Sequence, residues 1–594
     1  MDWNHELVTS LSWLGQTFVV SLFGLGATLW VLSRYTVWGR QFRLISWAYF
    51  NPAKNRLPLV WLALIILFTL FGVRLNVLLS FWSNSFYNAM QELDAKAFWF
   101  MLLVFSILAT THVCRSLLEY WLRQAFSIRW RIWLTRRLLD RWFDGQAYYR
   151  SRFVSDSADN PDQRIQQDIE SFVNSSMKLA MGLLEAVVSL MAFTLILWNL
   201  SGELTLLGTE IPRAMVFMVY LYVLVATVFA LKIGRPLIGL NFLNEKFNAN
   251  FRYALVRLRE YGESVAFYRG EAVERESLLS RFAQVIGNVW AIVFRTLKFQ
   301  GFNLSVSQAS VVFPFIVQAP RLLSKQITLG DVMQTAQAFD QVASALSFFR
   351  SSYEDFAAYR AVINRLAGFI ESMAASEKLP AVVIEPVRQG FSLAALTVRK
   401  PDQTPLVENL SLDLDAGSSL LIRGHSGIGK TTLLRTVAGL WPYFDGRVMR
   451  PVGEEALFLS QKPYLPLGSL RQCLHYPAAL AASDQRAGEI LQRCQLGHLL
   501  ARLDEEADWS SILSLGEQQR LAIGRVLLNR PEIVFLDEAS SAMDEGLEHA
   551  MYRLLRESLP QAIFVSVGHR RSLLEFHTHE LELLGEGGWR TAPL

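Results

Sequence analysis

The sequence predicts a polytopic α-helical membrane domain followed by an α/β domain, and two observations predict this division. Long apolar runs, each near the ~20 residues that a helix needs to cross the hydrocarbon core, all lie before residue 350. After about residue 376 the apolar runs shorten to strand length and alternate with helical patterns, which is typical of an α/β domain. The 594-residue chain is 52% hydrophobic and only 19% charged, whereas soluble domains are about 25% charged.

Composition excludes several classes of protein. Three cysteines in so long a chain build no disulfide framework, and we expect Cys114, Cys473 and Cys494 to be free thiols. A formal charge of +4 is too small to indicate nucleic-acid binding, so we expect no nucleic-acid partner.

Seven apolar runs are expected to cross the membrane, although the last two are interrupted by polar residues. The first run has neither a preceding basic stretch nor a following small-residue cleavage site, so we interpret residues 1–33 as an extra N-terminal transmembrane helix. Residues 34–375 are then a six-helix domain. The runs cover residues 11–32, 57–79, 97–120, 179–199, 214–234, 302–320 and 331–350.

Charge in the loops predicts the orientation. The loop between the first two runs carries five basic residues and no acidic residue, which places it in the cytoplasm. Alternation then places residues 121–177, 235–300 and the C-terminal half on the cytoplasmic side, and the N-terminus outside. Arg74, near the outer end of the second run, is expected to extend its guanidinium toward the water interface.

Polar residues inside the last two runs predict a water-filled cavity, because exposing them to lipid is costly. Each run gathers its polar residues on one helical face. Hydrogen bonding between helices is the alternative explanation and stays open. The residues are Asn303, Ser307 and Ser310 on one run, and Gln334, Gln337 and Gln341 with neighbouring Asp340 on the other.

A phosphate-binding loop follows the strand-like run 420–422. The segment 424–431 fits the P-loop pattern, in which glycines let backbone N–H groups surround phosphates at a helix N-terminus. Lys430 would reach the β- and γ-phosphates of ATP, and the Thr431 hydroxyl would hold Mg²⁺. The nucleotide-binding residues expected here are Gly424, His425, Ser426, Gly427, Ile428, Gly429, Lys430, Thr431 and Thr432.

Two carboxylates follow a second buried strand, 533–536. Asp537 is placed to bind Mg²⁺ through water, and Glu538 to orient and deprotonate the attacking water. Between the two motifs, the segment 513–520 has a Ser–Gly turn that opens a helix, which predicts another anion site.

With these motifs in this order, the C-terminal half resembles an ATP-binding cassette (ABC) domain. In the family pattern the segment 513–517 matches the signature loop, 541–544 the D-loop, Gln461 the Q-loop and His569 the switch histidine. The resemblance implies an ATPase that uses ATP and Mg²⁺. It implies catalytic roles for Glu538, His569 and Gln461, metal contacts for Thr431, Gln461 and Asp537, and further nucleotide contacts for Ser514, Gly516, Glu517 and Asp544.

The sequence departs from the family pattern in two places. The signature has Leu515 where the family usually has glycine and Glu517 where it usually has glutamine. The aromatic residue that usually stacks on adenine is absent near 398–401, so Arg399 or Lys400 would stack there by a cation–π contact. Because Glu538 and His569 are both present, we expect an active ATPase.

The membrane half resembles the bacterial relatives of the peroxisomal fatty-acyl-CoA (class D) ABC transporters, a branch that includes bacterial peptide-antibiotic and vitamin B12 uptake proteins. The resemblance is carried by residues 82–89, 130–135, 141–149 and 160–164, and by 439–442 after the P-loop. It implies an exporter-like ABC fold. The Pro- and Glu-containing stretch within 376–390 is interpreted as a linker, and residues 391–594 as the nucleotide-binding domain. Loops 144–170 and 260–271 would transmit motion between the domains.

One nucleotide domain per chain implies a half-transporter. In the ABC family each ATP lies between the P-loop of one domain and the signature of the other, so the chain should pair, most simply as a C2 homodimer. We expect an ATP-driven transporter of the bacterial inner membrane that takes up a hydrophilic or amphipathic solute, such as a peptide, a cobalamin-like molecule or an acyl substrate. An exporter of lipids or drugs is the first alternative, and a membrane-anchored nucleotide sensor is the second.

Overall fold

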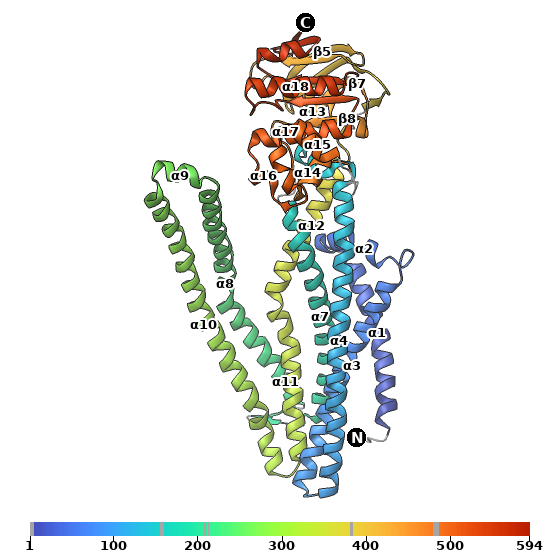
Figure 1. Cartoon of the computed structure of the whole chain (residues 1–594). Coiled ribbons are helices and arrows are strands. Elements are labelled where there is room, and N and C mark those ends of the chain that lie inside the picture. Colours follow the sequence, from blue (N-terminus) through green and yellow to red (C-terminus); the bar gives the residue numbers. More distant parts are fainter. Residues whose placement is uncertain are drawn as a thin grey trace. The chain divides into compact units, whose positions relative to one another are not determined.

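The computed structural model describes residues 5–154, 160–202, 204–206, 209–211, 213–380, 384–478 and 486–594. The chain divides into two compact units (Figure 1). The first unit is Met1–Gly145 with Ser155–Met373, and the second is Gln146–Val154 with Ala374–Leu594. A short segment from the membrane half, 146–154, therefore belongs to the second unit.

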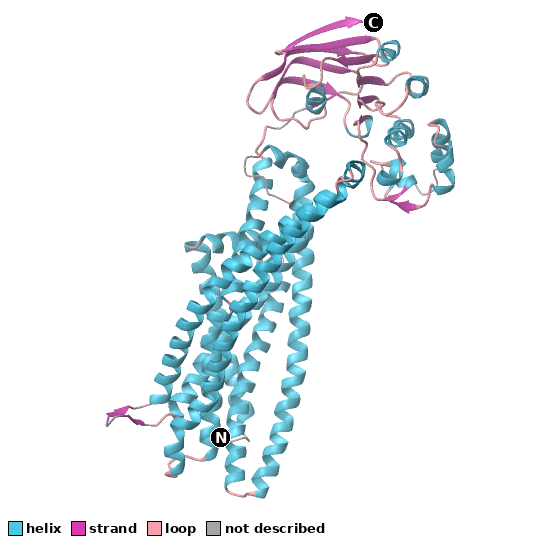
Figure 2. Cartoon of the chain, turned by 90° about the vertical axis from the view of Figure 1, so that its left-hand side faces the viewer, coloured by secondary structure: helices cyan, strands magenta, loops and turns pink. Residues whose placement is uncertain are grey.

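Helices make up almost all of the first unit, apart from a short hairpin of β1 and β2 (Figure 2). Pro161–Gln163 (α6) continues through one π-helical turn into α7. The elements are α1 (Glu6–Tyr35), α2 (Val37–Phe50), α3 (Leu57–Gln91), α4 (Ala95–Phe143), α7 (Ile169–Leu200), β1 (Leu204–Leu206), β2 (Thr209–Ile211), α8 (Ala214–Glu260), α9 (Gly262–Tyr268), α10 (Glu271–Leu323), α11 (Leu329–Ser351) and α12 (Tyr353–Ser376).

Six helices among the described residues are long and apolar enough to cross a membrane, rather than the seven predicted. The seventh predicted run, 331–350, forms α11, whose glutamines and aspartate lower its hydropathy. Nevertheless α11 packs against α3, α7, α8 and α10, and Ala338, Phe339 and Val342 on it are fully buried. It is thus a member of the bundle that carries one polar face.

Arg74 on α3 does not reach the water interface, so that prediction is wrong. Its side chain is buried, its Nη2 donates to the carboxylate of Glu6, and its Nε donates to the Ser10 hydroxyl at 3.0 Å. The guanidinium also lies 5.5 Å from the ring centroid of Trp13. Because Glu6 supplies an opposite charge, the guanidinium is satisfied inside the bundle, and the extra helix α1 is joined to α3.

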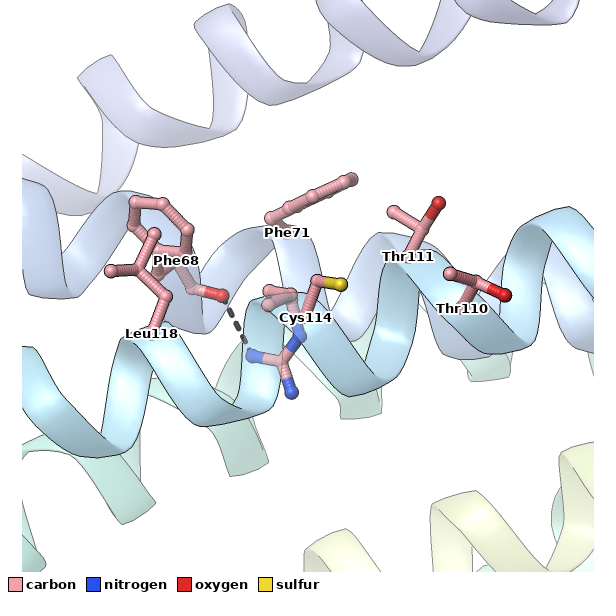
Figure 3. A pocket seen from close by; sticks show the side chains of 7 residues that line it. Phe68, Phe71, Thr110, Thr111, Cys114 and Leu118 are labelled. Atoms are coloured by element: carbon pink, nitrogen blue, oxygen red, sulfur yellow. Dashed lines mark hydrogen bonds between the residues drawn. The ribbon is translucent and has the colours of Figure 1, made fainter.

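A second group of charges lies between α3 and α4. The carboxylate of Glu119 pairs with Arg115 and Arg123, one turn away on either side, and accepts a hydrogen bond from the Thr69 hydroxyl at 3.0 Å. Arg115 also donates to the backbone carbonyl of Phe68 at 3.0 Å, beside a small open pocket of mainly apolar residues (Figure 3). Charges in these helices are thus paired with one another, as their cost in lipid requires.

The α8–α10 pair leaves much apolar surface exposed. The two helices pack on one another and are joined through α9 (Figure 1). All buried side chains of α8 lie between Ala214 and Leu237, in its first half. Exposed large apolar side chains beyond that point include Phe242, Tyr253, Leu255, Phe267, Tyr268, Val273, Leu279 and Phe282.

Two larger sheets, a two-stranded sheet of β9 and β10, and several helices form the second unit. The six-stranded sheet has the order β14-β13-β6-β12-β11-β8, and the four-stranded sheet the order β3-β7-β4-β5. The elements are β3 (Ile384–Pro386), β4 (Phe391–Arg399), β5 (Pro405–Leu414), β6 (Ser419–Arg423), α13 (Lys430–Val437), β7 (Phe444–Arg450), β8 (Ala456–Leu459), β9 (Gly468–Ser469), α14 (Leu470–His475), α15 (Arg486–Arg493), β10 (Glu506–Ala507), α16 (Trp509–Ile512), α17 (Leu515–Asn529), β11 (Ile533–Asp537), α18 (Glu545–Ser558), β12 (Ile563–Val567), β13 (His579–Gly585) and β14 (Gly588–Pro593).

Three parallel strands at the centre of the larger sheet position the candidate site. β12 pairs in parallel with both β6 and β11. All three strands are almost continuously buried, as central parallel strands are. Their carboxyl ends meet at one edge of the sheet, which is where ligands bind in open α/β sheets.

Candidate nucleotide-binding site

The P-loop joins the end of β6 to the start of α13. Gly424, Gly427 and Gly429 have φ values of 145°, 80° and 113°, which glycine adopts at little cost. A Cβ on Gly424 would lie 2.8 Å from the carbonyl oxygen of Leu583, so a side chain has no room there. The loop therefore packs closely against β13 before the chain enters α13.

Lys430, the first residue of α13, closes this loop. Its Nζ donates to the carbonyl oxygens of Gly424 at 2.9 Å and His425 at 3.0 Å. Burial lowers the pKa of the Lys430 amine, while the carboxylates of Glu538 and Asp537 oppose that shift. The amine is thus held where anionic oxygens entering the loop would meet it.

A hydroxyl and a carboxylate lie together beside the loop. The Thr431 hydroxyl donates to Oδ1 of Asp537 at 3.3 Å. Burial raises the pKa of the Asp537 carboxyl, Thr431 lowers it, and the neighbouring Glu538 carboxylate raises it. A divalent cation would favour the ionised form, and hard oxygen donors of this kind suit Mg²⁺ with its remaining waters and phosphate oxygens.

Glu538 and His569 meet at the ends of neighbouring strands. His569 Nε2 lies 3.4 Å from Glu538 Oε1, and both side chains are solvent-accessible. Glu538 has a φ of 50°, which is strained for a residue other than glycine, and its N–H donates to the carbonyl of Val567 at 3.1 Å. Backbone strain of this kind persists only where the surrounding structure enforces it, and strained residues are common at functional sites.

Gln461 follows β8, and its side chain is exposed while its backbone is hydrogen-bonded. Its carbonyl oxygen accepts a hydrogen bond from Nε2 of Gln519 on α17 at 2.8 Å. Gln519 also donates to the Ser541 hydroxyl at 3.2 Å and accepts from the N–H of Ala542 at 3.0 Å. Gln519 is fully buried, and none of the sequence motifs includes it in a functional role; its signal in the sequence is a glutamine amid the buried positions of this helix.

The signature loop forms the start of α17. Ser514 is the N-cap, and Glu517 completes a capping box by accepting from the Ser514 N–H at 2.9 Å. Burial raises the pKa of the Glu517 carboxyl. Hydrogen bonds from Ser514 and from His498, 3.0 Å away, outweigh burial and hold this pKa below its usual value. A Cβ on Gly516 would lie 3.0 Å from the carbonyl oxygen of Ala542, so α17 packs closely on the D-loop.

The signature loop forms its hydrogen bonds with residues other than those of its own P-loop. Within the described part of the chain, no hydrogen bond joins Ser514, Gly516 or Glu517 to residues 424–432. Asp544, at the end of the D-loop, caps α18 by accepting from the N–H of Leu547 at 2.8 Å.

The expected adenine side of the site holds an ion pair. The Arg399 guanidinium pairs with the Asp445 carboxylate, and the Arg399 carbonyl accepts from the indole N–H of Trp441 at 2.8 Å. Phe153, from the segment 146–154, lies with its ring centroid 5.2 Å from that of Trp441. No local sequence pattern links these two aromatic residues, because they lie far apart in the chain.

The polar residues expected to line a membrane cavity divide into two kinds. Gln334 is buried, and its Oε1 accepts from the Asn84 amide at 3.0 Å, which is hydrogen bonding between helices. Gln337 and Asp340 on the same helix are exposed. On α10, Ser307 is exposed, whereas Asn303 and Ser310 are half-buried; Gln341 on α11 is also half-buried.

Comparisons with known proteins cover both units. A family model described as "ABC transporter transmembrane region 2" matches residues 45–323, and one described as "ABC transporter" matches residues 407–541. An ABC transporter ATP-binding protein of Haemophilus influenzae is 45% identical over 591 residues, which is 99% of this chain and 100% of that protein.

Two further proteins are similar over most of their length. The inner membrane ABC transporter ATP-binding protein YddA of Escherichia coli is 34% identical over 524 residues, 87% of this chain and 92% of that protein. The solved structure of a bacterial Atm1-family ABC exporter with ATP bound superposes with a TM-score of 0.67 at 18% identity, covering 90% of this chain and 94% of that chain. That likeness shows the fold, a helical membrane unit followed by a nucleotide-binding unit.

Proposed function

The chain belongs to the ABC transporter family, and from this we propose that it is a homodimeric half-transporter that moves a solute across the bacterial inner membrane. It is an ATP-driven membrane transporter with an ATPase domain of the ABC type. It is a multi-pass inner-membrane protein whose ATP-binding domain is cytoplasmic. The observation that carries the proposal is the meeting of Lys430, Asp537, Glu538 and His569 where β6, β11 and β12 end.

The positions of these side chains at the carboxyl ends of β6, β11 and β12 support the following roles in ATP hydrolysis. Backbone N–H groups of 424–432 and the Lys430 amine bind the ATP phosphates, and Thr431 and Asp537, with Gln461, hold Mg²⁺. When bound, Mg²⁺ neutralises charge on the β- and γ-phosphates. Glu538 orients a water molecule and takes its proton as the water oxygen bonds to the γ-phosphorus and the bond to the bridging oxygen breaks. His569 positions Glu538 and the γ-phosphate.

Two observations support the homodimer. Among the described residues, Ser514, Gly516 and Glu517 form no hydrogen bond with the P-loop of their own chain, so they are available to the ATP of a partner. The exposed apolar side chains of α8–α10 also need a cover that the described part of one chain does not supply. Size-exclusion chromatography with light scattering, on the detergent-purified full chain, is expected to give twice the mass of the chain.

For the solute, we propose uptake of a hydrophilic or amphipathic molecule such as a peptide, a cobalamin-like molecule or an acyl substrate, in keeping with the class D branch that the sequence resembles. Exposed Gln337 and Asp340 on α11 offer the hydrogen bonds that such a solute needs. Export of lipids or drugs is the competing direction. The presence of both Glu538 and His569 favours transport over a sensor that does not hydrolyse ATP.

Catalysis is tested by Glu538→Gln in reconstituted vesicles. ATP hydrolysis is expected to fall at least about 100-fold, because the general base is lost, while ATP binding is retained. Glu532→Gln is the matched control, because Glu532 is exposed just before the same strand, and it should leave the rate unchanged. An undiminished rate in Glu538→Gln would make the catalytic assignment wrong.

The solute site is tested by Gln337→Ala with Asp340→Ala, in vesicles offered labelled peptides, cobalamins and acyl chains from either side. Uptake is expected to fall while ATP hydrolysis persists. Loss of both activities together would indicate a packing role for these residues. Movement only out of the cytoplasmic side would replace uptake by export, and ATP turnover without movement of any probe would favour the sensor.

A further inference from the structure

A large cavity lies within the first unit, between α1, α2, α3, α4 and α7. Its volume is about 1360 Å³, which exceeds the ~300–1,000 Å³ of typical small-molecule pockets. Its lining residues are far in sequence from the residues of the nucleotide-binding site. Its walls include the C-terminal half of α1, the helix that precedes the six-helix domain. None of the functional residues named above lines it.

The apolar part of this cavity belongs to the membrane-spanning helices. Leu29 and Trp30 of α1 line it opposite Leu59 and Leu62 near the start of α3. Gly26 also lines it, and a Cβ built there would meet nothing within 4 Å. The gap between α1 and α3 is therefore lined by side chains that suit hydrocarbon.

The other part of the cavity contains hydrogen-bond donors without partners. Ser46 Oγ, Trp130 Nε1 and Arg137 Nη1 are buried and make no hydrogen bond in the structure. Ser46 and Trp130 are each only 1% exposed. An unsatisfied buried polar group lowers stability by about 1–3 kcal/mol, and a charged group by more. A hydrogen-bond acceptor bound in the cavity would remove this cost.

The same part of the cavity is positively charged. Arg40, Arg43 and Arg137 line it, and among the described residues no carboxylate lies within ion-pair distance of them. Glu371 is the one acidic residue among the lining residues, and it is exposed, as are Arg40 and Arg43. Arg40 and Arg43 lie on α2, in the basic segment between the first two spans, which is on the cytoplasmic side of the membrane.

From this arrangement we propose that the cavity binds one anionic phospholipid of the cytoplasmic leaflet. The acyl chains lie between α1 and α3, and the phosphate oxygens accept hydrogen bonds from Arg43 and Arg137, with Ser46 and Trp130 as further donors. A two-chain lipid matches the cavity in size, in its apolar half and in its excess of donors over acceptors. The site does not depend on which solute the protein transports.

The test uses the full chain purified in detergent and titrated with dioleoyl-phosphatidylglycerol or dioleoyl-phosphatidylethanolamine, with bound lipid counted by native mass spectrometry. We expect one phosphatidylglycerol per chain, bound at least about 10-fold more tightly than phosphatidylethanolamine. The double variant Arg43→Gln with Arg137→Gln should reduce phosphatidylglycerol to the affinity of phosphatidylethanolamine. Arg34→Gln with Arg56→Gln is the control, because it removes the same charge outside the cavity.

A second pair of variants tests the apolar half without touching the charges. Gly26→Phe fills the cavity and should weaken both lipids at least about 10-fold, whereas Gly24→Phe, which has equal space but lies outside the cavity, should not. Equal binding of the two lipids, unchanged binding in the arginine double variant, or equal effects of the two glycine variants would each overturn the proposal. If the arginine variant fails to fold, the glycine pair still decides the outcome.

Discussion

Gln519 donates its side-chain amide to the backbone carbonyl oxygen of Gln461 at 2.8 Å. The same side chain bonds to Ser541 and Ala542, so one buried glutamine joins three segments: the loop after β8, the start of the signature helix α17, and the D-loop. Two of these segments are proposed to serve different ATP molecules of the dimer. A displacement of the Gln461 loop at one ATP would therefore be transmitted through Gln519 to the segments at the other ATP.

Gln519→Ala is expected to lower ATP hydrolysis and leave the affinity for ATP nearly unchanged. The change leaves the Gln461 carbonyl and the Ala542 N–H without partners, each at about 1–3 kcal/mol, and none of the bonded atoms belongs to the P-loop. Hydrolysis and binding of a fluorescent ATP analogue on the same preparation measure the two effects. Gln492→Ala, on an exposed face of α15, is the control, and a weakened affinity with normal turnover would contradict the assignment.

Glu517→Gln and Glu517→Ala should differ in stability. Glutamine at this position still completes the capping box with Ser514, whereas alanine loses it, so only Glu517→Ala should cost about 0.5–2 kcal/mol. Thermal unfolding of the full chain measures this. His498→Ala removes the partner of Glu517 without removing the cap, and it should behave like Glu517→Gln; equal unfolding temperatures for the glutamine and alanine variants would be inconsistent with the cap.

His577 should make stability depend on pH. Burial lowers the pKa of His577 to about 4, and its ring bonds to the Leu573 carbonyl and the Ser566 hydroxyl. An unfolded histidine takes up a proton below about pH 6.5 while the folded one stays neutral, so its contribution is complete above pH 6.5 and is lost as the pH falls to 4. The loss is on the order of 3 kcal/mol.

The measurement for His577 is the unfolding temperature between pH 7.5 and pH 4.5. The wild-type chain should lose stability over this range more steeply than His577→Asn. His549→Gln, an exposed histidine on α18, should retain the wild-type slope. A His577→Asn slope as steep as wild type would mean that other groups carry the pH dependence.

Arg74→Glu should destabilise the chain, and Glu6→Arg in the same chain should restore it. Removing one partner of a buried ion pair costs about 3–5 kcal/mol, because the other charge remains buried, whereas the exchanged pair regains an opposite charge. Unfolding temperature and yield in detergent measure both changes. Failure of the exchange to rescue the single variant would indicate that α1 is held by packing alone.

Much of the nucleotide site was predictable from the sequence. The P-loop at 424–431 and the carboxylates Asp537 and Glu538 each follow a buried strand, and parallel strands bring their carboxyl ends to one edge of a sheet. Local patterns therefore specified this part of the geometry, and the 3.3 Å distance between Thr431 and Asp537 agrees with it. The catalytic roles themselves stay predictions.

The remaining features depend on contacts between segments that are distant in sequence. The periodicity of apolar residues along the chain does not reveal such contacts. Arg74 was expected at the water interface, because nothing near it in sequence reveals that Glu6 lies beside it. The packing of Phe153 on Trp441 and the bonds of Gln519 are of the same kind. The polar face of α11 was visible, but only packing separates buried Gln334 from exposed Gln337.

The pairing of Arg74 with Glu6 also bears on how the protein enters the membrane during synthesis. An arginine on a single spanning helix costs up to about 2.5–3.5 kcal/mol on insertion, the full amount applying at the bilayer centre. Because α1 is made before α3, the Glu6 carboxylate is already in place when the ribosome delivers Arg74. The first helix thus lowers the cost of inserting the third, so α1 would act as an assembly factor encoded in the same chain.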